Sequence, residues 1–303
     1  MKGNIMNNKL TYIGLSILII ILVFCIFGPF FSPYGEYEIF YIDSRTNKEV
    51  RMNEETLEME YLLIYEKAPI SLNHWLGTDI AGRDVLTRLM YGGRVSLIVA
   101  FGVIIIELII GVTLGSIAGY FGGIIDRIIM RIVEIFFCIP FIPIMLIISS
   151  IMLSYDVLPK YRIYFIMLVM GLFEWAKVAR IIRGQVLLLR NMEYIKATEA
   201  MGANIYRKIF KHFIPNMMPM IILIATMDIG TVILMESVLS YLGVGIAFPY
   251  ASWGNMVTAV KQSIVLKEHW NIWVPPGVCI LLTVLAFHFI GDGLRERFDP
   301  KIK

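Results

Sequence analysis

The feature that most constrains this chain is a series of long windows with almost no charged residue. The first runs from Thr11 to Gly35 and carries no charge at all. A helix needs about 20 apolar residues to cross the roughly 30 Å hydrocarbon core of a bilayer. Apolar residues make up 58% of the 303 residues and charged residues only 17%, which is too apolar for an ordinary soluble domain. The sequence therefore predicts an all-α polytopic membrane protein.

Six windows are predicted to form transmembrane helices. They are Thr11–Gly35, Val95–Ile125, Ile128–Tyr155, Ile163–Ile182, Asn216–Ser240 and Trp273–Ile290. The first is too long for the apolar part of a cleaved signal peptide, and no small-residue cleavage site follows it, so we expect it to be retained. Six crossings place both termini on the same side of the membrane.

The distribution of lysine and arginine predicts the orientation. With the N-terminus inside, sixteen of the 27 basic residues fall in cytoplasmic segments, and seven of the others lie in the long first outer loop. Long loops are translocated largely regardless of their charge, so these seven carry little weight. We therefore expect both termini to be cytoplasmic.

Composition divides the chain into successive segments. Residues 1–35 are predicted to form an N-terminal tail and the first transmembrane helix, and residues 36–94 an external insert with a pre-span segment. Residues 95–292 form a five-helix core that contains a cytoplasmic loop, and residues 293–303 a cytoplasmic tail.

Two parts of the external segment have a pattern of their own. Residues 38–52, with a turn at Thr46–Lys48, fit either a small strand–turn–strand hairpin or a loosely ordered loop. The stretch from Thr78 to Tyr91 is predicted to be a separate amphipathic helix, capped by Thr78 or Asp79. That helix would either dock an external protein or lie on the membrane surface.

The cytoplasmic loop, residues 190–215, is predicted to contain two short helices. The first runs from Glu193 to Met201 and ends at Gly202, because glycine takes the left-handed conformation after a helix without a Cβ clash. Asn204 is a natural N-cap for the second helix. The apolar residues of the second helix recur every four positions, at Ile205, Ile209 and Phe213.

Such a helix pair has two interpretations. It lies on lipid headgroups, or it docks on a protein. The small residues Ala197, Thr198 and Ala200 favour a protein, because they permit a close approach of two backbones. Pro215 then ends the second helix or begins the next span.

The spacing of this loop resembles the cytoplasmic signature loop of ATP-binding-cassette importer permeases: Glu-Ala-Ala, three residues, Gly, nine residues, Ile-x-Leu-Pro. Aligned on Gly202, the signature glutamate falls at Lys196, the alanines at Ala197 and Thr198, and the proline at Pro215. Residues 194–203, Tyr-Ile-Lys-Ala-Thr-Glu-Ala-Met-Gly-Ala, are similar to the variant that is common in the peptide-transport branch.

Further segments resemble the C-type subunit of dipeptide and oligopeptide importers. Residues 74–97, with His-Trp-Leu-Gly-Thr-Asp and Gly-Arg-Asp, are similar to the block before its second span. Residues 240–254 are similar to its outer loop after the fifth span, and residues 291–300 to its tail. The resemblance covers roughly residues 10–35 and 71–303 and omits the acidic insert.

This resemblance implies an importer type I permease-like core in the membrane of a bacterial cell. Two homologous permeases form the pathway for short peptides, two cytoplasmic ATPases drive it, and an external binding protein delivers the substrate. ATP and Mg²⁺ are expected on the ATPases, because this chain has no Gly-x4-Gly-Lys-Ser/Thr loop. No cofactor is expected in this chain. The implied coupling residues are Tyr194, Lys196, Ala197, Thr198, Glu199, Ala200, Gly202, Arg207 and Pro215.

Three acidic residues inside the predicted spans are candidates for the translocation path: Glu107, Asp228 and Glu236. An ionisable residue at the bilayer centre costs roughly 2.5–3.5 kcal/mol on insertion scales and is a functional candidate by default. Glu236, near the outer end of its span, is more consistent with a structural role. Asp228 is the stronger candidate for the path.

Other classes of function remain as alternatives. The same machinery carries nickel, metallophores or glutathione in related systems, and an ion-coupled secondary transporter would use the acids as proton or sodium sites. The four histidines are isolated from one another in the sequence, and no metal-ligating or nucleophilic constellation is visible. We therefore expect a transporter subunit with neither an enzymatic activity nor a metal site of its own.

Overall fold

The computed structural model describes residues 9–51, 61–202 and 204–298, and most of them are helical. The long helices are α1 (Lys9–Phe31), α2 (Val85–Phe121), α3 (Gly123–Cys138), α4 (Phe141–Ser154), α5 (Pro159–Arg190), α8 (Ile214–Tyr241) and α11 (Trp270–Phe298). The short ones are α6 (Glu193–Ala200), α7 (Ile205–Lys208), α9 (Trp253–Val257) and α10 (Ser263–Glu268). The strands are β1 (Phe40–Asp43), β2 (Glu49–Arg51) and β3 (Leu62–Ile64).

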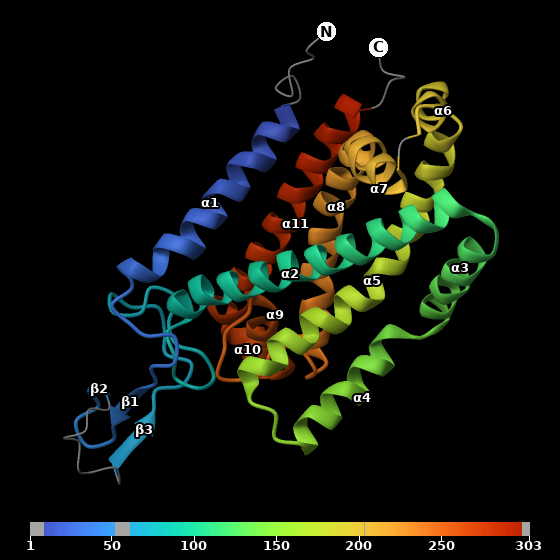
Figure 1. Cartoon of the computed structure of the whole chain (residues 1–303). Coiled ribbons are helices and arrows are strands. Elements are labelled where there is room, and N and C mark those ends of the chain that lie inside the picture. The colour runs from blue at the N-terminus through green and yellow to red at the C-terminus, as the bar shows by residue number, and fades with distance from the viewer. Residues whose placement is uncertain (1–8, 52–60, 203, 299–303) are drawn as a thin grey trace.

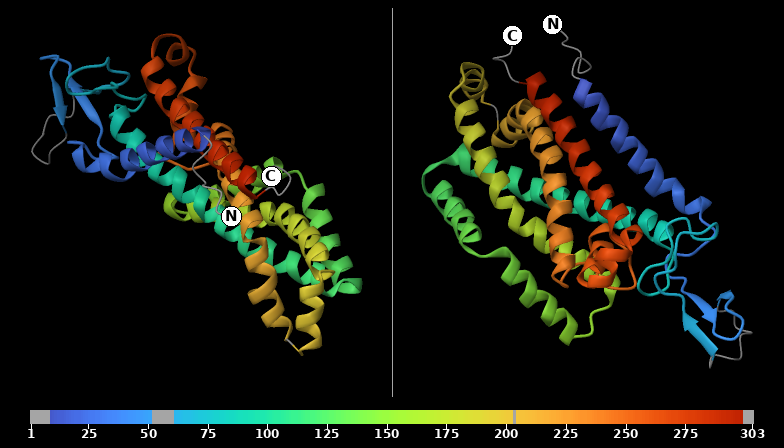
Figure 2. Two further views of the ribbon diagram at one scale, coloured as in Figure 1. Left: turned by 90° about the horizontal axis from the view of Figure 1, so that it is seen from above. Right: turned by 180° about the vertical axis from the view of Figure 1, so that it is seen from behind.

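The long helices form one bundle with two distinct ends (Figure 1). The Lys9 end of α1, the Phe298 end of α11 and the α6–α7 pair lie at one end. The sheet, α9 and α10 lie at the other. Figure 2 shows α1 beside α11 at one edge of the bundle and α3 with α4 at the opposite edge. We call these the α6–α7 end and the sheet end.

Within the described residues, four helical segments are long and apolar enough to cross a membrane. They are Lys9–Phe31, Val85–Phe121, Ile209–Tyr241 and Trp270–Arg297. The bent pair of α3 and α4 makes a fifth if it is counted as one span. The helix α5 is long but carries too many charges to qualify by composition.

The predicted span Ile128–Tyr155 is not one continuous helix. The chain bends by 78° between α3 and α4. Pro140 disfavours helical geometry at the residue before it, and Ile139 accordingly has extended dihedral angles, φ −80° and ψ 122°. A window of apolar residues does not reveal such a break, because hydropathy is the same on both sides of it.

The predicted separate helix Thr78–Tyr91 is wrong. The helix begins at Val85, where the Asp84 carboxylate accepts a hydrogen bond from the Thr87 amide (2.7 Å), and it continues without a break to Phe121. The residues before Asp84 form turns instead. The pre-span segment and the core therefore share α2, and α11 likewise continues past residue 293 to Phe298.

The external insert contains a three-stranded antiparallel sheet with the order β2-β1-β3. The hairpin interpretation of residues 38–52 is confirmed for β1 and β2, which pair from Phe40 with Arg51 to Ile42 with Glu49. Asn47 has a positive φ of 52° in the turn, a conformation that asparagine tolerates. Met52 lies outside the described residues, and β3 was not predicted.

The helices α2 and α5 pack closely through a row of small residues on α2. An added Cβ at Gly111 would lie 2.6 Å from Val178, and one at Gly115 would lie 2.6 Å from the Ala179 carbonyl oxygen. Small residues at intervals of four are typical of tightly packed helices in lipid. This contact aligns the middle of the bundle, where Glu107 of α2 and Lys177 of α5 lie.

Candidate functional sites

The predicted helix pair is present at the α6–α7 end. The first helix, α6, begins at Glu193, whose negative charge suits a helix N-terminus. Gly202 follows it with a φ of +75°, so the predicted left-handed position is confirmed. The backbone then enters α7 and passes through a π-helical turn, Ile209–Phe213, directly into α8.

Pro215 lies in the first turn of α8. Of the two alternatives left by the sequence, it therefore begins the span and does not end the second helix. Because α8 continues directly from the π-helical turn, this proline lies next to the place where the turn already interrupts the regular hydrogen-bond pattern of the helix.

Most of the described coupling candidates are exposed residues. Tyr194, Lys196, Gly202, Arg207 and Pro215 are exposed, and Thr198 is half-buried. The side chains of Ala197, Glu199 and Ala200 lie outside what the structure describes. Beside them, Met201 is 78% exposed although it is apolar.

Contacts that the sequence did not predict hold this end in place. Lys208 Nζ donates to Tyr120 Oη (2.9 Å) at the end of α2, and Phe213 packs against the same Tyr120 ring. Arg183 makes two hydrogen bonds to the carboxylate of Asp126, of 3.0 and 2.6 Å. The pair is therefore anchored to α2 at its base and exposed above it.

Two of the three intramembrane candidates lie together in the middle of the bundle. Lys177 Nζ on α5 donates to Asp228 Oδ1 on α8 (2.8 Å) and lies 3.2 Å from Glu174 Oε2. Glu107 on α2 is completely buried and interacts electrostatically with Asp228 and Lys177. We call these four residues the midbundle cluster. It holds three carboxyl groups and one ammonium group, an unusual concentration of polar chemistry in an apolar bundle.

Glu236 does not belong to this cluster. It is buried at the sheet end, where its Oε1 accepts hydrogen bonds from Ser240 Oγ (2.7 Å) and Ser252 Oγ (3.0 Å). Ser252 also caps α9 in a reciprocal capping box with Asn255. These bonds hold the loop after α8 to the helix itself, which supports the structural role that the sequence favoured.

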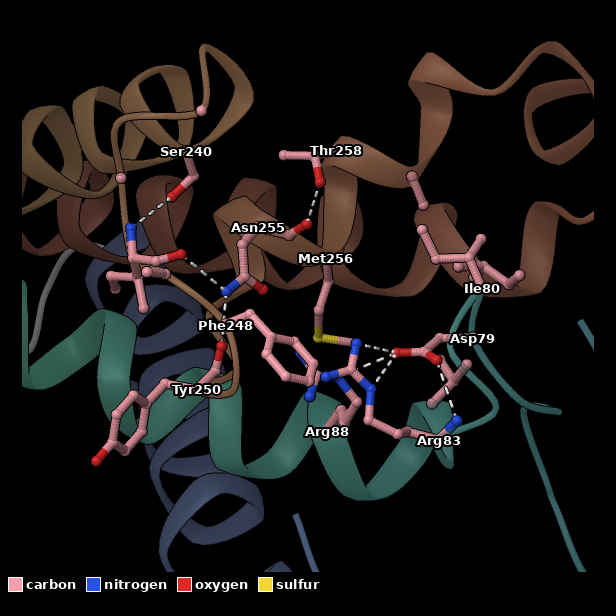
Figure 3. Close-up of a pocket in the computed structure, with 17 residues that line it drawn as sticks. Asp79, Ile80, Arg83, Arg88, Ser240, Phe248, Tyr250, Asn255, Met256 and Thr258 are labelled. Atoms are coloured by element: carbon pink, nitrogen blue, oxygen red, sulfur yellow. Dashed lines mark hydrogen bonds and ion pairs between the residues drawn. The ribbon is translucent and has the colours of Figure 1, made fainter. Parts of the chain in front are cut away.

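The sheet end also contains a cavity of about 310 Å³ between the start of α2 and the loop after α8 (Figure 3). Asp79 lies between two buried arginines, with Oδ2 2.8 Å from Arg83 Nη2 and 3.3 Å from Arg88 Nε. Arg88 Nη1 donates to the Pro249 carbonyl oxygen (3.3 Å), and the Arg83 guanidinium lies over the Phe248 ring. These contacts join segments about 160 residues apart, and apart from the charges no pattern in the sequence indicates them.

Within the described residues, no group of three or more His, Cys, Asp or Glu side chains is arranged to hold a metal ion.

Comparison with known proteins gives two family matches. A profile described as "Binding-protein-dependent transport system inner membrane component" matches residues 111–303. A second, the "N-terminal TM domain of oligopeptide transport permease C", matches residues 4–49. Together they include the first helix and every candidate coupling and intramembrane residue except Glu107.

Two relatives from Bacillus subtilis (strain 168) are similar over almost the whole chain. The oligopeptide transport system permease protein OppC is 38% identical, over 98% of this chain and 87% of that protein. The dipeptide transport system permease protein DppC is 37% identical, over 98% of this chain and 83% of that protein. Both alignments include the acidic insert, which the sequence resemblance had omitted.

A solved structure is similar in fold. It is an inward-facing form of the MetNI methionine ABC transporter, with a TM-score of 0.53 and 21% identity, covering 70% of this chain and 96% of that one. The permease-like fold predicted from the signature loop is therefore confirmed.

Proposed function

The chain belongs to the family of binding-protein-dependent transport system inner membrane components, and on this premise we propose that it is one of two homologous permeases of an ATP-binding-cassette importer for short peptides. The observation that carries the proposal is the exposed α6–α7 pair, joined through Gly202 and anchored at its base to α2. A helix pair in this position transmits force from a separate motor protein to the spans that it joins.

The proposed topology has six crossings with the α6–α7 end in the cytoplasm. It requires α5, which contains the predicted span Ile163–Ile182, to cross the membrane as well, although α5 is not among the helices that are apolar enough by composition. The charges of α5 have partners inside the chain: Lys177 pairs with Asp228, and Arg183 with Asp126. Paired charges directed into a bundle are compatible with a transmembrane helix. Counting α3 and α4 as one bent crossing then places Lys9 and Phe298 on the same side.

The energy in this proposal comes from two cytoplasmic ATPase subunits, which bind ATP and Mg²⁺. The chain has no phosphate-binding loop of its own. Residues 193–215 are proposed to contact an ATPase, with Gly202 as the joint, and an external binding protein delivers the substrate at the sheet end.

Short peptides are the proposed substrate because the two relatives aligned over the whole chain are named for oligopeptides and dipeptides. The path is proposed to pass beside the midbundle cluster. Lys177 and Glu174 are partly exposed on this chain, so the cluster opens to a surface that the second permease completes. Its charges are suited to the charged termini of a peptide.

Co-purification tests the assembly. The full chain, isolated in mild detergent from its native host, is expected to bring with it a nucleotide-binding subunit and a second permease. Uptake of radiolabelled dipeptide into cells is expected to stop when ATP is depleted and the ion gradient is held. Uptake that persists under those conditions would instead identify a secondary transporter. Mass spectrometry of the ligand on the binding protein separates peptides from nickel, metallophores and glutathione.

Replacement of Gly202 tests the coupling role. Proline has a fixed φ near −65°, so Gly202→Pro cannot take the native +75° and is expected to abolish uptake without affecting membrane insertion. Gly202→Asn is the matched control, because asparagine enters the left-handed region readily, and it should retain most of the uptake. Normal uptake by the proline variant would contradict the coupling role.

A further inference from the structure

An apolar groove lies at the sheet end, between the end of α1, the start of α2 and the loop before residue 76. Its volume is about 620 Å³. Phe24 and Phe31 of α1, Leu86 and Met90 of α2, and Leu72 and Trp75 of the loop line its apolar part. Neither the coupling surface nor the midbundle cluster includes any of these residues.

The rim of the groove is apolar and open. Leu72 is 95% exposed, Phe31 86% and Trp75 69%. Apolar surface left in water is unfavourable, and a contiguous patch of large apolar side chains marks a binding surface. These three side chains are therefore expected to be covered by something other than water.

The polar groups that line the groove already have partners within the chain. Ser32 Oγ and Thr87 Oγ1 are 2.7 Å apart, and Tyr34 Oη donates to the Asn73 carbonyl oxygen (2.8 Å). The Asp84 carboxylate accepts hydrogen bonds from Thr87. Because these groups already form hydrogen bonds within the chain, they are not available to a polar ligand. The groove is therefore suited to hydrocarbon.

The groove is at the level expected for the edge of the bilayer. The 23 residues of α1 span about 35 Å at 1.5 Å per residue, slightly more than the roughly 30 Å of hydrocarbon. Phe31, the last residue of α1, therefore lies close to the boundary with the headgroups. Tryptophan is enriched at that boundary, and Trp75 lines the groove beside Phe31.

The groove is also continuous with the lipid-facing side of α1. Ile20, Phe27 and Phe30 are large apolar side chains on this helix that remain more than half exposed. On a membrane-spanning helix such side chains face lipid. The neighbouring rim continues this surface past the end of α1 and onto the first turns of α2.

We propose that this groove binds one acyl chain of a phospholipid from the leaflet at the sheet end, with Trp75 at the headgroup boundary. The bound chain covers Phe31 and Leu72 and fills the space between α1 and α2. This site is independent of the transported substrate. It adds a lipid contact that fixes the end of α1 against the start of α2.

Fluorescence quenching by lipid tests the position of Trp75. The full chain is reconstituted into vesicles of phosphatidylcholine and phosphatidylglycerol, with bromine on the acyl chains of the phosphatidylcholine. The chain has five tryptophans, so the contribution of Trp75 is the difference between the wild type and Trp75→Phe. Brominated lipid is expected to quench most of the Trp75 fluorescence, and acrylamide in the water is expected to quench little of it. Trp270→Phe is the matched control for an exposed tryptophan outside the groove.

Native mass spectrometry after detergent washing tests for a bound lipid. The wild type is expected to retain a phospholipid that Phe31→Ser/Leu72→Ser loses. Ile19→Ser/Ile20→Ser is the matched control, because it changes exposed residues of α1 away from the groove, and it should retain the lipid.

Three results would overturn the proposal. One is quenching of Trp75 by acrylamide and not by brominated lipid, which would place the groove in water. Another is equal lipid loss from both double variants, which would indicate ordinary bilayer contact. The third is loss of bromine quenching when the second permease is co-assembled, which would show that a protein covers the groove.

Discussion

At the sheet end, polar side chains are buried and bonded to one another, whereas at the α6–α7 end apolar and charged side chains face outward. Glu236 at the sheet end is buried with two serine hydroxyls as partners. Met201 at the other end is 78% exposed, and most described side chains around it are exposed too. One end is thus held together by the chain itself. The other has an exposed surface, which is compatible with the proposed contact with an ATPase at that end.

Removing the Glu236 carboxylate is expected to have the largest effect on stability. Glu236→Ala leaves the hydroxyls of Ser240 and Ser252 buried without an acceptor, and each such group costs about 1–3 kcal/mol, so we expect a total loss of about 3 kcal/mol. Thermal unfolding in detergent measures it. Glu236→Gln retains an acceptor oxygen and should lose much less. An unchanged midpoint for the alanine variant would show that the sheet end does not depend on this residue.

The stability of the sheet end is also expected to depend on pH through His74. Its ring nitrogens lie 2.8 Å from Asp84 and 3.2 Å from Glu49. Burial alone lowers the pKa of His74, but the hydrogen bonds and negative charges of Asp84 and Glu49 outweigh it, so the pKa is raised.

A raised folded-state pKa means that the protonated histidine stabilises the fold. The stabilisation is complete below the unfolded pKa of about 6.5 and is lost as the pH rises through the folded value. Unfolding temperatures measured from pH 6 to pH 9 should therefore fall, and His74→Gln should remove this slope. An identical slope in the variant would assign the dependence to another group.

A smaller, local effect is expected at Gly202. An alanine at a φ of +75° costs about 1 kcal/mol, and Gly202 has no heavy atom within 4 Å of an added Cβ, so the cost is one of backbone strain alone. Hydrogen exchange in α6 and α7 should become faster while the global midpoint stays the same. Gly184→Ala, in the interior of α5 with the same free space, should instead be neutral or slightly stabilising. A lowered midpoint for Gly202→Ala would mean that this end is not structurally separate.

The smallest effect on stability is expected for Met201→Ser, within about 0.5 kcal/mol, because surface substitutions rarely exceed that. It should nevertheless weaken co-purification of the ATPase. Ile195→Ser is the contrasting variant on the same end, because Ile195 is buried and its replacement should destabilise the protein. Strong destabilisation by Met201→Ser would contradict the description of this surface as free for a partner.

The signals that predicted the fold correctly were local. The φ of Gly202 followed from the pattern at the end of α6, and the hairpin of β1 and β2 was one of the two alternatives that the turn residues between them left open. Predictions failed where a helix boundary depended on one residue inside a uniform pattern. Pro140 breaks a continuous apolar window, and Asp84 starts α2 several residues later than Thr78 or Asp79 would.

The same distinction between local and long-range signals applies to the candidate sites. The order and spacing of residues 193–215 are visible in the sequence, because they lie within one short segment. The partner of Asp228 was not predictable, since Lys177 is 51 residues away and the two meet only because α5 and α8 pack in the same bundle. The anchor between Lys208 and Tyr120, 88 residues apart, is of the same kind.

Local patterns in the sequence were enough to predict that the chain enters a membrane, where most of the long helices lie and where the signature loop lies. These properties depend on hydropathy, periodicity and backbone preference, which are summed over neighbouring residues. The partners of the two acids became visible only in the folded structure: Glu236 binds the loop after α8 while Asp228 pairs with Lys177, although both acids lie on the same helix. The role of a buried carboxylate depends on which groups surround it, and here those groups come from distant parts of the chain.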